Sequence, residues 1–237
     1  MNEDEFLRTY RKEDFENPIL GVDTVLFTCH EDALKVLIVK RENHPDRGKW
    51  GLPGGFVDLD EDSCLEDTAV RKVREKTRVN PPYIEQLATL GNKARDKRGW
   101  SVSVSYTALI AYQNCEASVD AVSDTRWVPL NELSALELAF DHREIIELAR
   151  ERVKQKALYS IVPAYALPEK FTLPELQRFH EILVGKSLQK KSFRRRIEQA
   201  NLLEETGESR RDAGRPAALY RVRRGTENYR FIRNLEV

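Results

Sequence analysis

The sequence predicts an α+β protein of two domains, with a sandwich of strands and helices in the first and two helices followed by a β-hairpin in the second. Chain length, the order of segments and the distribution of charge support this prediction. At 237 residues the chain fits two domains of ordinary size. Its strand-like and helix-like segments do not alternate regularly, which favours a sandwich over a doubly wound sheet.

Charge divides the chain although the net charge is zero. Residues 1–150 carry 20 basic against 28 acidic side chains, whereas residues 151–237 carry 19 against 11. An acidic half joined to a basic half indicates that only the C-terminal part meets a polyanion. The alternative is that charge simply scatters unevenly.

Composition excludes several classes of protein. A hydrophobic share of 41% with 33% charged residues is typical of globular proteins. No apolar run approaches the ~20 residues that span a bilayer, and the acidic N-terminus argues against a secretory signal. Three widely spaced cysteines without a CxxC pair favour reduced thiols over a structural zinc site. We therefore expect a cytoplasmic protein.

The first domain is expected to comprise residues 1–156. Apolar residues at three- and four-residue spacing predict two helices, at 64–79 and 141–156. β-branched and apolar runs predict five strands, at 19–27, 34–41, 84–90, 102–111 and 127–130.

The second domain is expected to comprise residues 157–237. It begins with an uncharged, proline-bearing segment, 157–168, which we interpret as a packed connector. Thr172 and Glu175 have the spacing of a capping box, so a helix is predicted to start there and to stop at Gly185. A second helix at 188–201 precedes two strand-like segments around a basic loop. Helix, turn, helix and basic hairpin are typical of a winged helix-turn-helix.

The turn at 52–57 and the helix after it resemble the Nudix box. In that pattern five residues separate a glycine from a glutamate, and seven more separate the glutamate from a helix that reads Arg-Glu-apolar-x-Glu-Glu-x-Gly-apolar. Gly55 and Glu61 match the first two positions, and the helix resumes the pattern at Arg71 after a two-residue insertion. Over roughly residues 19–150, this resemblance implies a Nudix-type α/β/α sandwich with a mixed sheet.

Two lysines interrupt the pattern. Nudix hydrolases use the helix glutamates to hold divalent metal ions, usually Mg²⁺, which requires carboxylate or other oxygen ligands. Lys72 and Lys76 occupy two of those glutamate positions, and only Glu75 remains. Because the lysines are four residues apart, both stand on one face of the helix, where they would exclude a metal. We therefore expect no metal and no catalytic residue, although a plain solvated helix is the alternative.

The expected ligand is anionic. The lysines can attract a diphosphate in place of the metal, and Nudix domains of this appearance are similar to ADP-ribose pyrophosphatases. ADP-ribose or a related nucleotide is therefore the expected regulatory ligand, without a cofactor. Trp50 could stack on a base or, more often for such a residue, pack in the core, and His142 is expected to be a capping or surface residue. The predicted ligand-binding residues are Arg41, Trp50, Gly54, Gly55, Phe56, Lys72, Glu75 and Lys76.

The second helix of the C-terminal domain is strongly basic. Phe193 and Ile197 are expected to point inward, which turns the basic positions outward for docking in a DNA major groove. The loop 210–216 is predicted to form the wing, where arginines meet phosphates or the minor groove. Two of the three consecutive arginines are expected to face DNA; a winged helix that binds protein is the alternative. The predicted contact residues are Lys190, Lys191, Ser192, Arg194, Arg195, Arg196 and Arg215.

Both halves together resemble one family, the Nudix-related transcriptional regulators of NAD metabolism (NrtR). The degenerate box, the helix at 193–196 and the wing at 214–220 carry this resemblance. It implies a homodimer that represses NAD-biosynthesis genes and leaves its operator DNA when ADP-ribose binds. A second hypothesis is an active ADP-ribose or sugar-nucleotide pyrophosphatase, and a third is a non-enzymatic scaffold. In the second, the metal ligands would be Glu61, Glu66, Asp67 and Glu75.

Overall fold

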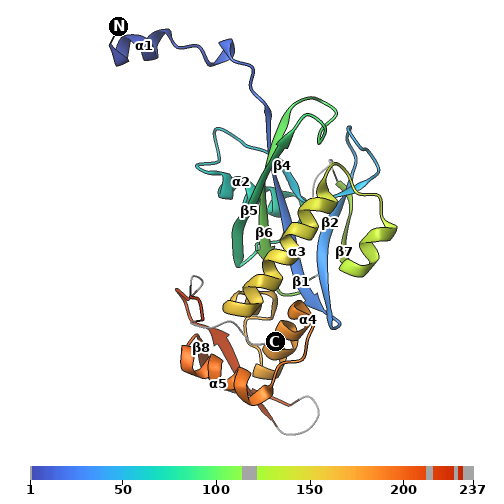
Figure 1. Ribbon diagram of the computed structural model, residues 1–237, viewed down its shortest axis with the longest axis vertical. Coiled ribbons are helices and arrows are strands. Elements are labelled where there is room, and N and C mark those ends of the chain that lie inside the picture. The colour runs from blue at the N-terminus through green and yellow to red at the C-terminus, as the bar shows by residue number, and fades with distance from the viewer. Residues whose placement is uncertain (1, 114–121, 212–215, 227–228, 232–237) are drawn as a thin grey trace.

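The structure is a computed structural model that describes residues 2–113, 122–211, 216–226 and 229–231 (Figure 1). Among these residues no helix is both long and apolar enough to cross a membrane. The elements run α1 (Glu3–Thr9), η1 (Lys12–Asp14), β1 (Ile19–His30), β2 (Ala33–Arg41), β3 (Trp50–Gly51), β4 (Gly54–Phe56), α2 (Leu65–Thr77), β5 (Tyr83–Asn92), β6 (Ser101–Leu109), β7 (Val122–Pro129), η2 (Leu130–Ala135), α3 (His142–Tyr159), η3 (Val162–Ala166), α4 (Leu173–Val184), α5 (Lys190–Ala200), β8 (Leu203–Arg210) and β9 (Ala217–Val222).

A mixed seven-stranded sheet forms the centre of the first domain. Its main path runs β3-β2-β1-β6-β5, with β4 paired to β1 and β7 paired to β2. β1 and β6 are parallel, and the other neighbours are antiparallel. The mixed sheet that the sequence predicted is therefore confirmed.

Helices cover both faces of this sheet. Successive side chains of a strand point to opposite faces, so β1 can serve two apolar clusters. Leu26 packs with Val73 of α2, whereas Val25 and Phe27 pack with Ile145 of α3. This is the predicted α/β/α sandwich.

Several elements extend beyond their predicted bounds. β7 starts at Val122 rather than 127, and α3 continues to Tyr159, across the expected domain boundary after Lys156. α5 is shorter than expected: it begins at Lys190 rather than 188, and Asn201 ends it by taking a left-handed conformation. The N-terminal helix α1 was not predicted, and none of its residues is buried.

The second domain has the expected winged-helix elements. Thr172 caps α4: its hydroxyl accepts a hydrogen bond from the Glu175 N–H, and Glu175 accepts one from the Thr172 N–H at 2.7 Å. Gly185 ends the helix with φ +77°, a conformation that glycine adopts without strain. β8 and β9 form the hairpin, and Phe171 pairs with Tyr220 beside it.

The two domains share an apolar core. Phe179 and Leu183 of α4 belong to the same cluster as Val36 of β2 and Val153 of α3. In Figure 1, α4 lies directly against the lower end of the sheet and α3. The connector between α3 and α4 is packed as predicted, with Val162 fully buried. The first helix of the winged unit is therefore fixed to the Nudix-type sandwich.

Candidate functional site

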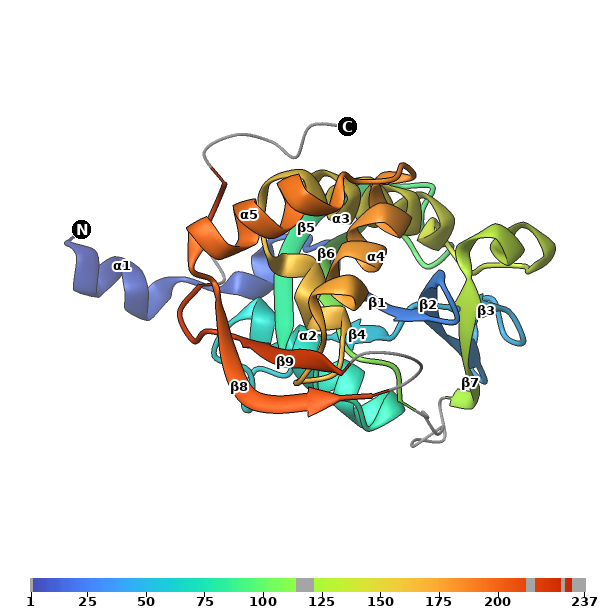
Figure 2. The same cartoon turned by 90° about the horizontal axis from the view of Figure 1, so that it is seen from below.

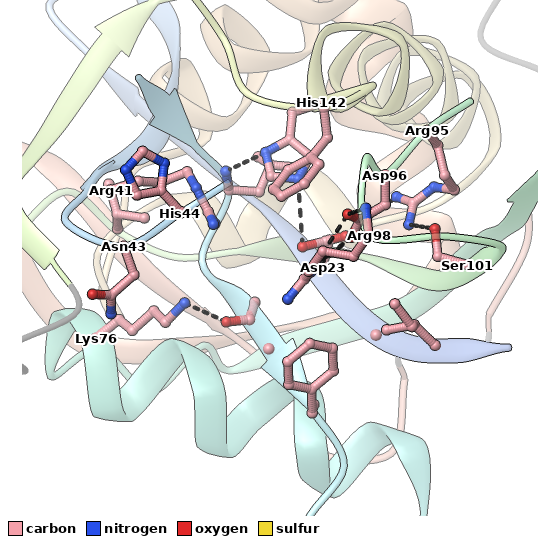
Figure 3. A pocket seen from close by; sticks show the side chains of 18 of the residues that line it. Asp23, Arg41, Asn43, His44, Lys76, Arg95, Asp96, Arg98, Ser101 and His142 are labelled. Carbon is pink, nitrogen blue, oxygen red and sulfur yellow. Dashed lines mark hydrogen bonds and ion pairs between the residues drawn. The ribbon is translucent and has the colours of Figure 1, made fainter. Parts of the chain in front are cut away.

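A cavity of about 230 Å³ opens beside β1, between the turn that joins β3 to β4 and the start of α3 (Figure 3). Its lining comes from segments far apart in the chain. Four Lys or Arg side chains and two Asp side chains take part: Arg41, Lys76, Arg95, Arg98, Asp23 and Asp96. This excess of positive charge suits an anionic ligand.

Lys76 is the helix lysine that reaches the cavity. Its Nζ donates a hydrogen bond to the carbonyl oxygen of Gly54. Burial lowers the pKa of Lys76 to about 8; the charge of Asp23 opposes this shift, and those of Arg41 and Lys72 add to it. An anion bound beside this ammonium would stabilise its protonated form.

Lys72 and Glu75 do not line this cavity, which corrects their place among the predicted ligand-binding residues. The Nζ of Lys72 lies 2.9 Å from one carboxylate oxygen of Glu75, and Nη1 of Arg71 lies 2.8 Å from the other. Burial raises the pKa of Glu75, but the hydrogen bonds from Lys72 and Arg71 lower it overall. The single glutamate left in the helix pattern is therefore held by two cations of its own helix.

The loop before α2 closes on the helix through Asp62. Its carboxylate accepts hydrogen bonds from the Arg71 guanidinium and, at 2.7 Å, from the Thr68 hydroxyl. The hydrogen bond from Arg71 holds the pKa of Asp62 well below its usual range, although burial opposes it. Glu61, which matches the Nudix spacing, is exposed and lies 3.8 Å from Arg71. The two-residue insertion thus lets Asp62, which follows Glu61, make the contact with Arg71 that holds the loop against α2.

The described residues contain no group of three or more His, Cys, Asp or Glu side chains placed to hold a metal ion. Asp67, one of the carboxylates weighed as a ligand, accepts hydrogen bonds at 3.1 Å from the N–H groups of Ser63 and Cys64. Asp67 therefore stabilises the N-terminal end of α2. Together with Glu75, two of the four weighed carboxylates are engaged in contacts of their own helix.

His142 is buried, which corrects the expectation of a capping or surface residue. Only 2% of it is exposed, because the turn after β3 covers the start of α3. Its Nδ1 accepts a hydrogen bond from the Leu52 N–H at 2.9 Å, so the neutral ring carries its proton on Nε2. Nε2 lies 3.6 Å from a carboxylate oxygen of Asp23. Burial lowers the pKa of His142, although Asp23 opposes this, so the ring is neutral at pH 7.

Arg41 lines the cavity beside an aromatic ring. Its Nε donates to the carbonyl oxygen of Pro45 at 3.1 Å, and its guanidinium carbon lies 4.7 Å from the centre of the Phe140 ring. Phe140 adopts a left-handed backbone conformation with φ +51°, and its N–H donates to Asp46 at 3.2 Å. The position of the Arg41 side chain is thus set from two sides.

The glycine turn forms one wall of the cavity through Gly54, Gly55 and Phe56. A Cβ atom on Gly54 would lie 2.3 Å from Oδ1 of Asp23 and 2.4 Å from the carbonyl oxygen of Val22. No side chain fits there without a shift of the backbone. Glycine is therefore required where β4 approaches β1.

Trp50 lies in the core and does not line the cavity. It is 9% exposed, and the Arg126 guanidinium carbon lies 4.8 Å from the centre of its ring. The structure thus agrees with the core-packing interpretation and corrects the inclusion of Trp50 among the predicted ligand-binding residues. The ring is held in the apolar cluster under the sheet.

The basic helix α5 presents one clear outward face. Phe193 and Ile197 are each 2% exposed and point inward, as predicted. Lys191 and Arg195 are exposed and four residues apart, so they share the opposite face. Arg196 is half-buried, with its guanidinium carbon 6.0 Å from the centre of the Phe231 ring. The remaining candidates divide in the same way: Lys190 is exposed, and Ser192 and Arg194 are half-buried.

The wing is a two-stranded hairpin of β8 and β9 that follows α5 in the chain (Figure 2). At the tip end of β8, Arg210 forms an ion pair with Glu175 in the first turn of α4. This contact ties the wing to the winged-helix core. Arg215 lies outside the described residues.

Comparison with known proteins agrees with both halves of the structure. Residues 18–149 match the NUDIX domain, and residues 163–222 match the NrtR DNA-binding winged helix domain. An ADPR responsive transcriptional repressor, NtrR of Acinetobacter baylyi, is 41% identical over 235 residues, which cover 99% of this chain and 94% of the relative. The chain belongs to the NrtR family.

Two solved structures of Shewanella oneidensis NrtR are similar to this chain. NrtR complexed with a 27mer DNA is 60% identical, with a TM-score of 0.86 over 92% of this chain and 99% of that chain. The NUDIX domain complexed with ADP ribose is 55% identical, with a TM-score of 0.63 over 65% of this chain and 99% of that chain. The predicted combination of a Nudix sandwich and a winged helix is confirmed.

Four charged cavity residues of this NrtR chain were not predicted from the sequence. Asp23 is the one carboxylate in the largely apolar strand β1, and it accepts a hydrogen bond from the Ser103 hydroxyl at 2.6 Å. Arg95 forms two hydrogen bonds, at 2.8 and 2.9 Å, with Asp141 just before α3. The carboxylate in the strand was the one available signal. The other two missed residues, Asp96 and Arg98, sit in a polar hairpin that looks like any surface loop.

Proposed function

We propose that this NrtR-family chain is a transcriptional repressor that leaves its operator DNA when ADP-ribose or a related nucleotide occupies the Nudix cavity. The Acinetobacter relative is an ADPR responsive repressor, and Shewanella NrtR has been crystallised with DNA and, as its NUDIX domain, with ADP ribose. The observation that carries the proposal is the basic cavity into which α2 projects Lys76 in place of a metal-binding carboxylate.

The cavity lining suits a diphosphate attached to sugar hydroxyls. Arg41 and Lys76 supply cationic donors for phosphate oxygens. Asp23 and Asp96 supply carboxylate acceptors for hydroxyl groups. Phe56, which is 48% exposed, offers a ring on which a base can stack. These are the chemical parts of ADP-ribose.

We further propose that the protein binds this nucleotide without hydrolysing it. Hydrolysis by the Nudix mechanism needs a divalent metal held by helix carboxylates. Here the three pattern positions Lys72, Glu75 and Lys76 carry a net charge of +1, where three glutamates would carry −3. A sensor with this charge keeps its signal intact.

The family also suggests how the repressor is organised. We propose a cytoplasmic homodimer that controls NAD-biosynthesis genes. In such a dimer two α5 helices would meet successive major grooves about one helical turn apart, roughly 34 Å. The spacing of the two helices then decides whether a palindromic operator is bound.

The packing of the protomer supports a particular route from ligand to DNA. α3 starts at His142, which lines the cavity, and it ends at Tyr159 beside the connector. Because α4 packs into the same core, a protomer is expected to move as one body. Ligand binding would then release DNA by changing the arrangement of the two protomers.

The test is a fluorescence anisotropy titration of labelled genomic promoter fragments with the full chain, in the absence and presence of ADP-ribose. We expect specific DNA binding that ADP-ribose reverses. Lys76→Gln should keep DNA affinity and need roughly ten-fold or more ADP-ribose, since the variant cannot make a charged hydrogen bond to the ligand.

Lys72→Gln is the matched control, because Lys72 occupies the same helix pattern but does not line the cavity. It should respond as the unmodified chain does. Unchanged DNA affinity at saturating ADP-ribose would exclude ADP-ribose as the signal.

A further inference from the structure

Phe56 and Asp23 are neighbours on one face of the paired strands β1 and β4. The strands are antiparallel, with Gly21 opposite Phe56 and Asp23 opposite Gly54. Residues two apart in a strand point to the same face, so Phe56 and Asp23 are diagonal neighbours, roughly 7–8 Å apart. Gly21, which also lines the cavity, has no side chain to fill the space between them. That space is therefore open to a ligand.

The carboxylate of Asp23 is held in position from several sides. Its Oδ2 accepts the Ser103 hydroxyl at 2.6 Å and lies 3.8 Å from Nη2 of Arg95. Its Oδ1 lies 3.6 Å from Nε2 of His142, and the side chain is 16% exposed. A carboxylate fixed in this way can accept further hydrogen bonds from a ligand without losing side-chain freedom when the ligand binds.

Two arginines on this side of the cavity already have acidic partners (Figure 3). Arg98 donates three hydrogen bonds to the carboxylate of Asp96, at 2.7, 3.1 and 3.2 Å. Arg95 is held by the two hydrogen bonds to Asp141, at 2.8 and 2.9 Å. A phosphate placed beside Asp23 would use these arginines only by displacing their carboxylate partners.

Arg41 and Lys76 lie on the other side of the cavity in Figure 3. Their side chains donate hydrogen bonds to backbone carbonyl oxygens, those of Pro45 and Gly54. A carbonyl group does not neutralise a full charge, so both cations can still attract phosphate oxygens. The cavity is therefore asymmetric: one side suits a diphosphate, and the side with the ring and the carboxylate suits a nucleoside.

We propose that Asp23 selects nucleotides whose ribose next to the base has free hydroxyl groups, and that it rejects nucleotides with a 2′-phosphate. With the base stacked on Phe56, the attached ribose lies over Gly21 and directs its hydroxyl groups toward Asp23. A carboxylate accepts hydrogen bonds from these hydroxyls and repels a phosphate in the same place. Acidic side chains in dinucleotide-binding folds distinguish the two forms of ribose by the same chemistry. The inference rests on the proposed function, because it assumes that the nucleotide occupies this cavity.

The test is titration calorimetry of the full chain with ADP-ribose and with 2′-phospho-ADP-ribose. We expect the unmodified chain to bind ADP-ribose on the order of 100-fold more tightly, because like charges in close contact are strongly unfavourable. Asp23→Asn removes the charge and keeps the shape of the side chain. This variant should bind ADP-ribose about ten-fold more weakly and 2′-phospho-ADP-ribose about ten-fold more tightly, so that the selectivity disappears.

Two further variants separate charge from other effects. Ser103→Ala keeps the carboxylate but removes the hydrogen bond that orients it. It should weaken the binding of ADP-ribose and still reject the 2′-phosphate. Asp124→Asn is the matched control, because it removes the same charge from β7 at a position that does not line the cavity. Both affinities should stay unchanged in this control.

The ratio of the two affinities decides the outcome. Equal affinities of the unmodified chain for the two nucleotides would overturn the inference and leave the proposed function intact. If Asp23→Asn weakens both nucleotides alike, Asp23 only supports the cavity and the inference is wrong. A chain that binds neither nucleotide would overturn the proposed function and the inference together.

Discussion

The ammonium group of Lys76 determines how the cavity responds to pH. With a pKa lowered to about 8, it is mostly protonated at pH 7 and mostly neutral at pH 9. A bound diphosphate favours the protonated form, so binding raises this pKa and takes up a proton near pH 8. Ligand affinity must therefore fall as the pH rises through 8.

We expect the affinity for ADP-ribose to fall by up to about ten-fold between pH 7 and pH 9, since the protonated fraction falls by that factor. Titration calorimetry at several pH values measures it. Lys76→Arg keeps a permanent charge across this range and should flatten the profile. An equally steep profile in that variant would assign the titration to another group.

Gly54 and Gly55 form a matched pair for testing the close approach of β4 to β1. Gly54→Ala would place Cβ 2.4 Å from the backbone oxygen of Val22, whereas Gly55→Ala would meet the flexible methylene groups of Lys72 at 3.0 Å. We expect Gly54→Ala to lower the free energy of unfolding by about 1–3 kcal/mol and Gly55→Ala by less. Urea denaturation of both variants measures this difference, and equal losses would contradict the backbone clash.

At the scale of elements, α5 determines which arginines can touch DNA. Its inward residues Phe193 and Ile197 fix the rotation of the helix. Lys191 and Arg195 then project farthest from the core, while Arg196 leans toward the Phe231 ring. Consecutive arginines thus differ in role because each residue turns the helix by about 100°.

We expect Lys191→Ala and Arg195→Ala each to flatten the log–log salt dependence of DNA binding by roughly 0.9 for each phosphate that the helix no longer neutralises. Gln199→Ala is the control, because Gln199 is exposed on the same helix and uncharged. Anisotropy titrations at several salt concentrations supply the slopes. A larger change for Arg196→Ala than for Arg195→Ala would reverse the assignment of faces.

At the scale of the whole molecule, local patterns in the sequence predicted the elements, and distant contacts decided the site. Alternating apolar residues and the capping box of Thr172 act over a few positions, so the strands and α4 were predictable. The contact between Leu52 and His142 joins residues 90 positions apart. Nothing near His142 in the sequence signals that a turn will cover it, and the same holds for Arg95 and its cavity.

The lysine substitutions were visible in the sequence, but their different roles were not. Both Lys72 and Lys76 stand on one face of α2, as the spacing requires. Only the folded turn decides that Lys76 meets the Gly54 carbonyl while Lys72 pairs with Glu75. The Nudix-box pattern therefore identified Lys72 and Lys76, but only the packing of the folded chain shows which of them lines the cavity.

Coupling between nucleotide and operator is a property of the dimer as a whole. If ADP-ribose weakens operator binding, the operator must weaken ADP-ribose binding by the same factor, because both factors describe one thermodynamic cycle. A typical coupling of ~1–3 kcal/mol corresponds to a change of roughly 5–150-fold.

We expect the ratio of operator affinities, without and with saturating ADP-ribose, to equal the ratio of ADP-ribose affinities without and with operator. Anisotropy gives the first ratio and calorimetry the second. Because α3 and α4 share one core, the distance between probes on the sandwich and the winged helix of one protomer should stay constant. The distance between the two α5 helices should change instead. If only the distance within one protomer changes, the ligand-dependent movement occurs at the connector around Val162 and not at the dimer interface.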